Sequence, residues 1–122
     1  MDRTRLEFFI RKPPALNNLY GITRHGKKYL TDNGRVWKDE CVLTVKSFGM
    51  DQFVGPVSLL IHLYTCRQQD NDGILKILMD SLEASDIIKN DYWIFDLRVV
   101  KHPCKNYDEG IKIILEEMNV KS

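Results

Sequence analysis

Apolar and polar residues alternate in three stretches of the chain, and each alternation predicts a β-strand. The first stretch, residues 5–11, ends at Pro13-Pro14, and the others cover residues 93–101 and 111–115. A fourth stretch, residues 57–64, is apolar at almost every position, which is typical of a strand covered on both faces in the middle of a sheet. The pattern therefore predicts four strands. In the strand at residues 93–101, an apolar ladder of Trp93, Phe95, Leu97 and Val99 lies on one face.

Two other stretches repeat their apolar residues at helical spacing. Thr31 or Asp32 is a suitable cap for a helix that ends near Gly49, and a second helix begins near Asp72. The resulting order, β-α-β-α-β-β, predicts an α+β fold with one mixed sheet of about four strands and two helices. Because 122 residues suffice for one core, we expect a single domain spanning residues 1–122.

The connection after the second helix decides where Asp91 lies. A plain right-handed crossover would leave Asp91 at the end of the sheet far from Asp70. Seven extended residues from Ser85 to Asp91 cover about 23 Å, however, which is enough to bring the chain back to the end where Asp70 lies. We therefore predict that the strand beginning at Trp93 runs antiparallel to the strand at residues 57–64.

The net charge of +1 conceals an asymmetry between the two halves of the chain. Residues 1–50 carry ten Lys/Arg and five Asp/Glu, whereas residues 51–122 carry eight and twelve, so the halves have net charges of +5 and −4. A basic first half suits a protein that binds a polyanion, although an accident of surface composition explains the asymmetry equally well.

The three cysteines form no C-x-x-C pair, the first residues do not resemble a signal peptide, and no apolar run reaches the length of a membrane span. These features predict a cytoplasmic protein with reduced thiols and no membrane contact.

Like charges are crowded at Asp70-Asn71-Asp72-Gly73, four residues before Lys76. Two neighbouring carboxylates repel each other unless a cation neutralises them, and Mg²⁺ is commonly held by carboxylates and water. With Asp91 as a third carboxylate, the segment predicts a Mg²⁺ site for phosphodiester hydrolysis, in which Lys76 neutralises developing negative charge.

The same acids allow three other interpretations to be considered. A calcium loop is excluded because its first and twelfth positions would be Gln68 and Met79. An exposed ion-pair ladder of Asp72, Lys76 and Asp80, or a simple turn with a helix cap, explains the spacing about as well as a metal site.

Basic residues also gather in the loop that follows the first strand. Basic side chains attract phosphates regardless of sequence, and aromatic rings stack on bases, so this loop is a candidate DNA contact; a solvated surface loop is the alternative. The candidate DNA-binding residues are Lys12, Asn17, Tyr20, Arg24, Lys27 and Lys28.

Several segments together resemble the RusA-type Holliday-junction resolvases, over nearly the whole chain and in the same order. They are residues 13–20 (PPALNNLY), 29–31 (YLT), 70–72 (DND) with Lys76, 79–82 (MDSL) and 90–91 (ND) through 98–101 (RVVK). The resemblance implies a homodimeric, Mg²⁺-dependent endonuclease that resolves four-way DNA junctions by paired nicks, in bacteria or their phages. It also implies that Asp70, Asp72 and Asp91 bind the metal and that Lys76 is the catalytic lysine.

The chain departs from the family pattern at five positions. Gly73 stands where the family usually has Asn, and Asn90 replaces an acid often found beside the third carboxylate; Gln68, Gln69 and Ala15 also differ. Loss of a hydrogen bond at Gly73 would weaken the metal site. A module that binds branched DNA without cutting it is therefore the main alternative, and a metal-dependent nuclease of other specificity is a third.

Overall fold

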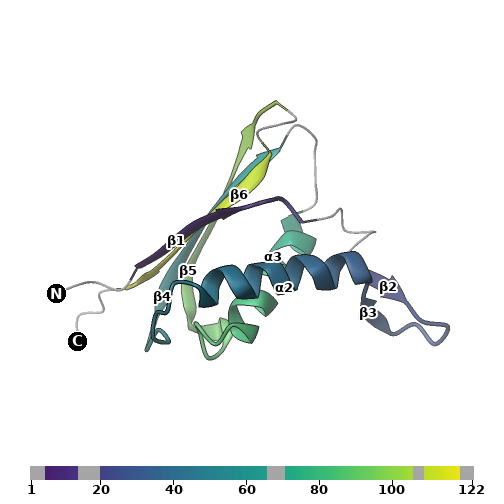
Figure 1. The fold of residues 1–122 in the computed structure, drawn as a ribbon, viewed down its shortest axis with the longest axis horizontal. Helices are drawn as coiled ribbons and strands as arrows, with labels where there is room; N and C mark the ends of the chain where they lie inside the picture. The colour runs from purple at the N-terminus through teal and green to yellow at the C-terminus, as the bar shows by residue number, and fades with distance from the viewer. Residues whose placement is uncertain (1–4, 14–19, 66–70, 106–108, 119–122) are drawn as a thin grey trace. The chain divides into compact units, whose positions relative to one another are not determined.

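The computed structural model describes residues 5–13, 20–65, 71–105 and 109–118. Contacts divide the chain into two compact units. Figure 1 labels the helices and strands of both. We call Met1–Lys12, Asp51–Gln68 and Ile88–Ser122 the sheet unit, and Pro13–Met50 and Gln69–Ile87 the helical unit.

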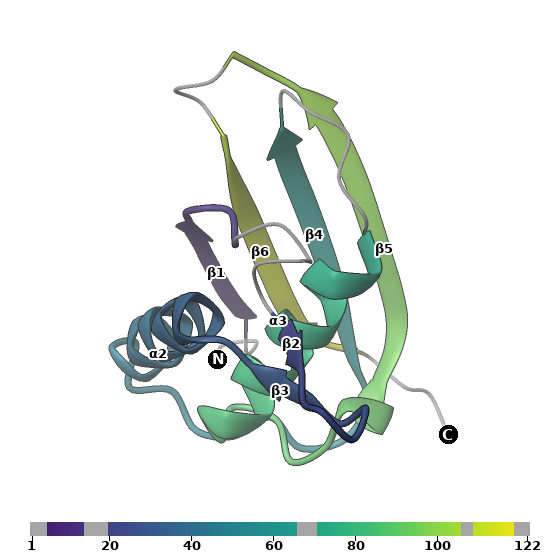
Figure 2. The same ribbon diagram turned by 90° about the vertical axis from the view of Figure 1, so that its right-hand side faces the viewer.

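The sheet unit contains a mixed sheet of four strands in the order β1-β6-β4-β5 (Figure 2). Strand β6 is antiparallel to both of its neighbours, β1 and β4, and β4 is parallel to β5. The mixed sheet and the central place of β4 confirm the sequence prediction. The strands are β1 (Arg5–Ile10), β4 (Val57–Thr65), β5 (Ile94–Pro103) and β6 (Gly110–Glu117).

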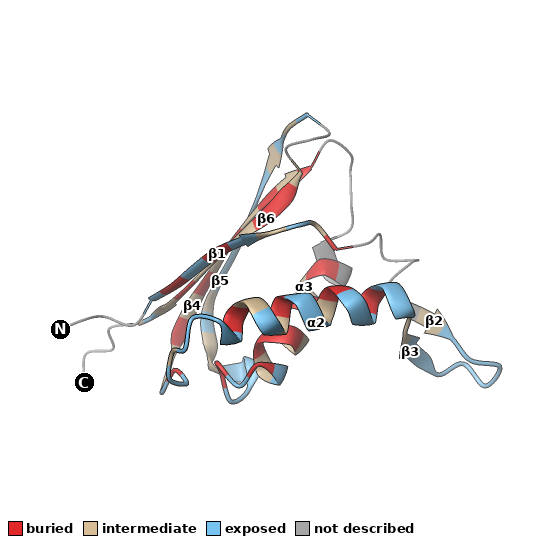
Figure 3. Ribbon diagram, viewed as in Figure 1, coloured by how far each residue is buried: buried red, intermediate tan, exposed pale blue. Residues whose placement is uncertain are grey.

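One face of this sheet forms an apolar core. Every second residue of β4 is buried, and the register sets these residues beside the buried residues of β6 and, through β6, those of β1 (Figure 3). Burying each such side chain contributes roughly 1.5–3 kcal/mol, so the alternation in the sequence is what fixes the register of the strands. The buried apolar residues of this face are Leu6, Phe8, Val57, Leu59, Ile61, Leu63, Ile111, Ile113 and Leu115.

The direction of β5 is opposite to the sequence prediction. We expected the strand after Trp93 to run antiparallel to the 57–64 strand, but β5 pairs with β4 in parallel, from Val57 beside Ile94 to Thr65 beside Pro103. Two neighbouring parallel strands need a crossover connection that returns the chain to the starting end. The prediction was wrong because the strand direction was chosen so that Asp91 would lie close to Asp70. The rule for right-handed crossovers, applied without that assumption, predicts the parallel direction that is observed.

Strand β5 is an edge of the sheet, and its apolar side chains are exposed. None of its ten residues is buried. The register shifts between Val57 and Ser58, which pair with Ile94 and Asp96, so Phe95 has no partner on β4 and is 64% exposed. Leu97 is 42% exposed. The apolar ladder expected at residues 93–99 therefore exists, but it does not contribute buried side chains to the core.

The helical unit contains the two expected helices, α2 (Asp32–Lys46) and α3 (Asn71–Ala84), which pack against each other (Figure 1). The Thr31 hydroxyl accepts a hydrogen bond from the Gly34 amide at 3.2 Å and so caps α2, as predicted. Burial raises the pKa of the Cys41 thiol to about 12, which keeps this thiol protonated at neutral pH. The buried apolar residues of the two helices are Trp37, Cys41, Val45, Ile74, Ile77, Leu78 and Leu82.

The segment predicted as a basic loop contains a short hairpin. Strands β2 (Tyr20–Ile22) and β3 (Lys28–Leu30) are antiparallel, with Gly21 opposite Tyr29. The Tyr29 ring lies where a side chain on Gly21 would be, so a larger residue there would require the exposed ring to move. Gly26 turns the chain with a φ of +80°, a conformation that glycine adopts without strain. We call Tyr20–Leu30 the basic hairpin.

Candidate functional site

The acidic segment lies at the start of α3. Asp70 falls outside the described residues, and of Asp72 only the backbone, at the second position of α3, is described. Lys76 is exposed one helical turn later. No group of three or more His, Cys, Asp and Glu side chains that could hold a metal is found among the described residues, a set that excludes the Asp70 and Asp72 carboxylates. The assignment of these residues to a metal site therefore stays a prediction.

Asp91 is the first residue of a short 3-10 helix, η1 (Asp91–Trp93), that leads into β5. Its side chain is exposed. The Asn90 side-chain oxygen accepts a hydrogen bond from the Tyr92 amide at 3.2 Å and caps the turn. Asn90, noted above as a departure from the family pattern, therefore fixes the backbone on which Asp91 is carried.

Asp91 and the acidic segment leave the sheet at opposite ends. Asp91 precedes Ile94, the partner of Val57 at the start of β4, whereas Asp70 follows Thr65 at the end of β4. The nine residues of β4 rise about 3.3 Å each, so its ends lie roughly 26 Å apart. The sheet unit thus does not bring Asp91 to the end from which the acidic segment continues.

Lys12, a predicted DNA contact, makes interactions within the sheet unit. Its ammonium group lies 3.0 Å from a Glu109 carboxylate oxygen and donates to the Thr65 hydroxyl at 3.3 Å. The Thr65 hydroxyl donates in turn to Glu109 at 3.3 Å. We call these three residues the Lys12 cluster. Thr65 is the last residue of β4, so the cluster fixes the point from which the chain continues to Asp70. Sequence reasoning missed it because Lys12 and Glu109 are 97 positions apart.

The Lys12 cluster provides a stability prediction. We expect Lys12→Met to lower the free energy of unfolding by about 1–2 kcal/mol, because the half-buried Glu109 carboxylate loses a charged hydrogen-bond donor. Urea denaturation measures the change. Lys27→Met, which removes an exposed lysine of the basic hairpin, is the control and should change stability by less than about 0.5 kcal/mol. Additive effects of Lys12→Met and Glu109→Gln would show that the two side chains are not coupled.

The remaining predicted DNA contacts lie on or before the basic hairpin. Arg24, Lys27 and Lys28 are exposed, and His25 adds a further basic group at the turn. The turn is held by the Thr23 hydroxyl, which accepts from the Lys27 amide at 3.1 Å. Asn17 lies outside the described residues, and the side chain of Tyr20 is not described. The hairpin therefore presents several cations on a defined turn, an arrangement suited to phosphates.

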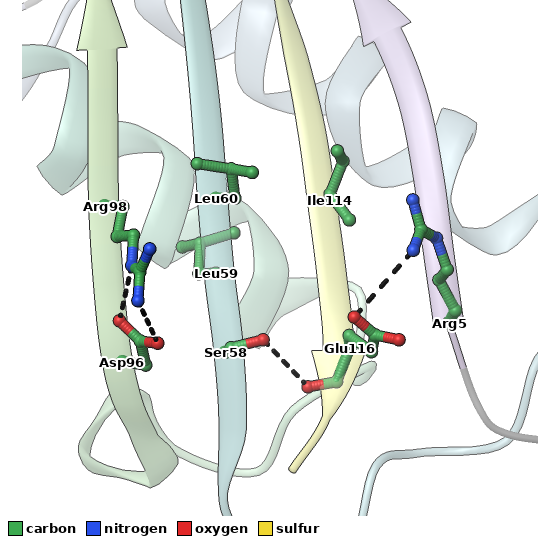
Figure 4. Close-up of a pocket in the computed structure, with 8 residues that line it drawn as sticks. All are labelled: Arg5, Ser58, Leu59, Leu60, Asp96, Arg98, Ile114 and Glu116. Atoms are coloured by element: carbon green, nitrogen blue, oxygen red, sulfur yellow. Dashed lines mark hydrogen bonds and ion pairs between the residues drawn. The ribbon is translucent and has the colours of Figure 1, made fainter.

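A cavity of about 190 Å³ opens on the other face of the sheet, lined in part by Leu60 and Ile114 (Figure 4). Its charged groups are paired: Arg98 with Asp96 at 3.3 Å and Arg5 with Glu116 at 3.8 Å. Nearby, hydrogen bonds from Lys112 and Arg5 lower the pKa of the Glu7 carboxyl. The described charges that line the cavity, Arg5 and Arg98 with Asp96 and Glu116, therefore sum to zero, which does not favour this cavity as a phosphate contact.

The sequence is similar to curated crossover junction endodeoxyribonucleases. It is 26% identical over 98 residues to the crossover junction endodeoxyribonuclease rusA of Enterobacteria phage HK97, covering 78% of this chain and 81% of that protein. It is 28% identical over 93 residues to the RusA enzyme of Escherichia coli K12 and, equally, to that of Enterobacteria phage 82, covering 74% of this chain and 78% of each relative. No family model matches the sequence. No helix in the described part of the chain has the length and apolar character needed to cross a membrane.

Proposed function

Since the chain is a homologue of the RusA-type Holliday-junction resolvases, we propose that it resolves four-way DNA junctions by Mg²⁺-dependent phosphodiester hydrolysis and that it acts as a homodimer. The similarity to phage and bacterial resolvases supports the activity. The donor set supports the metal, because Asp70, Asp72 and Asp91 offer the carboxylate oxygens that Mg²⁺ prefers.

The parallel pairing of β4 and β5 is the observation that most supports the proposed homodimer. Asp70 follows Thr65 by five residues, and five fully extended residues cover at most about 18 Å. Those five residues cannot span the roughly 26 Å between the two ends of β4. A second subunit offers another source of Asp91 for a site that uses all three acids.

The exposed edge of β5 provides a way for the second subunit to supply it. Long edge strands with exposed apolar residues readily pair with another strand. In a two-fold pairing, the two copies of β5 run antiparallel, and the start of one lies beside the end of the other. Pro103, at the end of β5, is the register partner of Thr65. The partner's Asp91 then lies beside the end of β4 from which the acidic segment continues.

In this arrangement, Asp70 and Asp72 of one subunit and the partner's Asp91 would hold the metal. Mg²⁺, when bound there, would supply a water of lowered pKa and charge to offset that which builds on the phosphate during hydrolysis. Lys76, exposed on α3, neutralises part of the same charge as a point cation. The Lys12 cluster and the Asn90 cap fix the two backbone segments that carry the acids. Two-fold symmetry gives two such sites, one for each of the paired nicks that resolve a junction.

The test is incubation with a synthetic four-way junction and Mg²⁺. We expect symmetric nicks in two opposing strands from the wild-type protein, and binding without nicks from Asp72→Asn. Binding without nicks by the wild type would instead support the alternative, a branched-DNA-binding module with a metal site weakened at Gly73. Equal cutting of duplex, flap and single-stranded substrates would show a nuclease of other specificity.

The basic hairpin provides a second prediction. We expect the Arg24→Ala/Lys27→Ala variant to bind the junction more weakly and to reduce the slope of log K against log salt by about two, because each phosphate contact contributes about 0.9. Fluorescence anisotropy at several salt concentrations measures the slope. Lys46→Ala removes an exposed lysine from the last turn of α2 and is the control. An unchanged slope in the double variant would exclude the hairpin as a phosphate contact.

A further inference from the structure

Three aromatic side chains lie together on the surface immediately after Asp91. The Trp93 and Phe95 rings are nearly parallel, with centroids 6.3 Å apart and planes 21° from each other. Tyr92 meets Trp93 edge to face at 5.3 Å. We call Tyr92, Trp93 and Phe95 the aromatic cluster. Among the residues that the structure describes, these three line a surface pocket of about 280 Å³.

The cluster is exposed to a degree that the fold does not require. Tyr92 is 67% and Phe95 is 64% exposed, and Phe95 occupies the irregular position of β5 that has no partner on β4. Three neighbouring rings with exposed apolar surface are unusual on a folded protein and mark a place where something binds. The cluster lies at the start of β5, an edge strand in which no residue is buried.

The position of the cluster in the chain ties it to the proposed site. Asp91, Tyr92 and Trp93 form η1, and the Asn90 cap holds this turn. The backbone therefore fixes the rings and the Asp91 carboxylate together. Lys89, two residues before Asp91, is exposed and supplies a cation on the same segment. DNA held at the proposed site through Asp91 would pass close to the cluster, because Tyr92 and Trp93 directly follow Asp91 in η1.

We propose that the aromatic cluster stacks against a nucleobase that is unpaired at the branch point of the DNA, and that it thereby positions the strand to be cut. This inference rests on the proposed function and names what its site recognises. Every base has a face that stacks on an aromatic ring, so such a contact tolerates any sequence and selects unpaired bases. Bases at a branch point are also less costly to unstack than bases inside a duplex.

The test compares loss of the rings with loss of the base. The Tyr92→Leu/Phe95→Leu variant keeps apolar side chains but removes two rings, and a four-way junction with abasic sites at the branch point removes the bases. Binding is measured without Mg²⁺ so that the DNA stays intact. We expect each change to raise the dissociation constant about tenfold, as for one lost stacking contact, and the two together to raise it no further. Phe9→Leu, which removes an exposed ring from the opposite edge strand β1, should leave binding unchanged.

Other outcomes overturn the inference. If the ring variant and the abasic junction act additively, or if the ring variant binds like the wild type, the cluster does not stack on these bases, even though the wild type still nicks intact junctions. If the ring variant sediments as a monomer while the wild type is a dimer, the cluster is a subunit contact. If the wild type neither binds nor cuts the junction, the proposed function fails and this inference fails with it.

Discussion

Mixing Asp72→Asn subunits with Asp91→Asn subunits is expected to restore nicking that neither variant shows alone. Each variant by itself should cut at least about a thousandfold more slowly than the wild type, because loss of a ligand of the proposed metal would remove several kcal/mol of transition-state stabilisation. In the mixed dimer, the intact Asp72 of one subunit meets the intact Asp91 of the other. That pairing recreates one wild-type site, and the second site carries both substitutions.

The restored activity has a distinctive form. If subunits exchange freely, half of the dimers are mixed and each has one working site, so about a quarter of the wild-type sites return. These dimers should nick one strand without the paired second nick, which denaturing gels of a junction labelled on each strand will reveal. Mixing Asp70→Asn with Asp72→Asn subunits is the control, and it should restore nothing because both acids come from the same subunit. No recovery in the first mixture would place all three acids of each site within one chain.

Leu97→Lys is expected to separate the dimer into monomers and to abolish nicking. Leu97 is 42% exposed on the edge strand β5, and a lysine on an edge strand discourages pairing with another strand because its charge would lose water in the interface. Monomers cannot bring the partner's Asp91 to the acidic segment, so activity should fall about as far as in Asp91→Asn. Sedimentation velocity and the junction assay measure the two effects.

A matched control is available in the helical unit. Leu43 on α2 is 68% exposed, so Leu43→Lys makes the same chemical change at an exposed position of a helix. This variant should remain a dimer and keep its activity. A Leu97→Lys protein that is folded, dimeric and active would show that the β5 edge is not the subunit contact.

The strands and helices that bury apolar side chains could be predicted from the sequence. The alternation at residues 111–115 became β6, whose residues Ile111, Ile113 and Leu115 are buried, and the continuous apolar run became the central strand β4. Thr31 caps α2 as its residue type and position indicated. These features are local: burial, periodicity and capping act over a few residues, so they leave a readable pattern.

The direction of β5 and the basic hairpin could not be predicted in the same way. Strand direction depends on a connection of nearly thirty residues, and a local pattern reads the same for either direction. The hairpin strands have three residues each and few buried side chains, so alternation gives no signal there. Only Gly26, in the middle of basic residues, marked the turn.

In the candidate site, too, local features could be predicted from the sequence, whereas contacts between distant residues could not. The acids and Lys76 could be proposed from residue type and spacing, and the family resemblance is supported by the relatives. The role of Lys12 could not be anticipated, because its partners Thr65 and Glu109 come from distant parts of the chain. The exposure of Phe95 and its lack of a partner on β4 are tertiary features that no composition reveals.

A crystal structure of the protein grown with Mn²⁺ tests the shared site most directly, since Mn²⁺ favours the same carboxylate ligands as Mg²⁺ and is located by its anomalous scattering. The account predicts one Mn²⁺ peak per subunit, bound by Asp70 and Asp72 of one chain and by the partner's Asp91, with the two copies of β5 paired across the two-fold axis. A peak bound by Asp70, Asp72 and Asp91 of a single chain would contradict it.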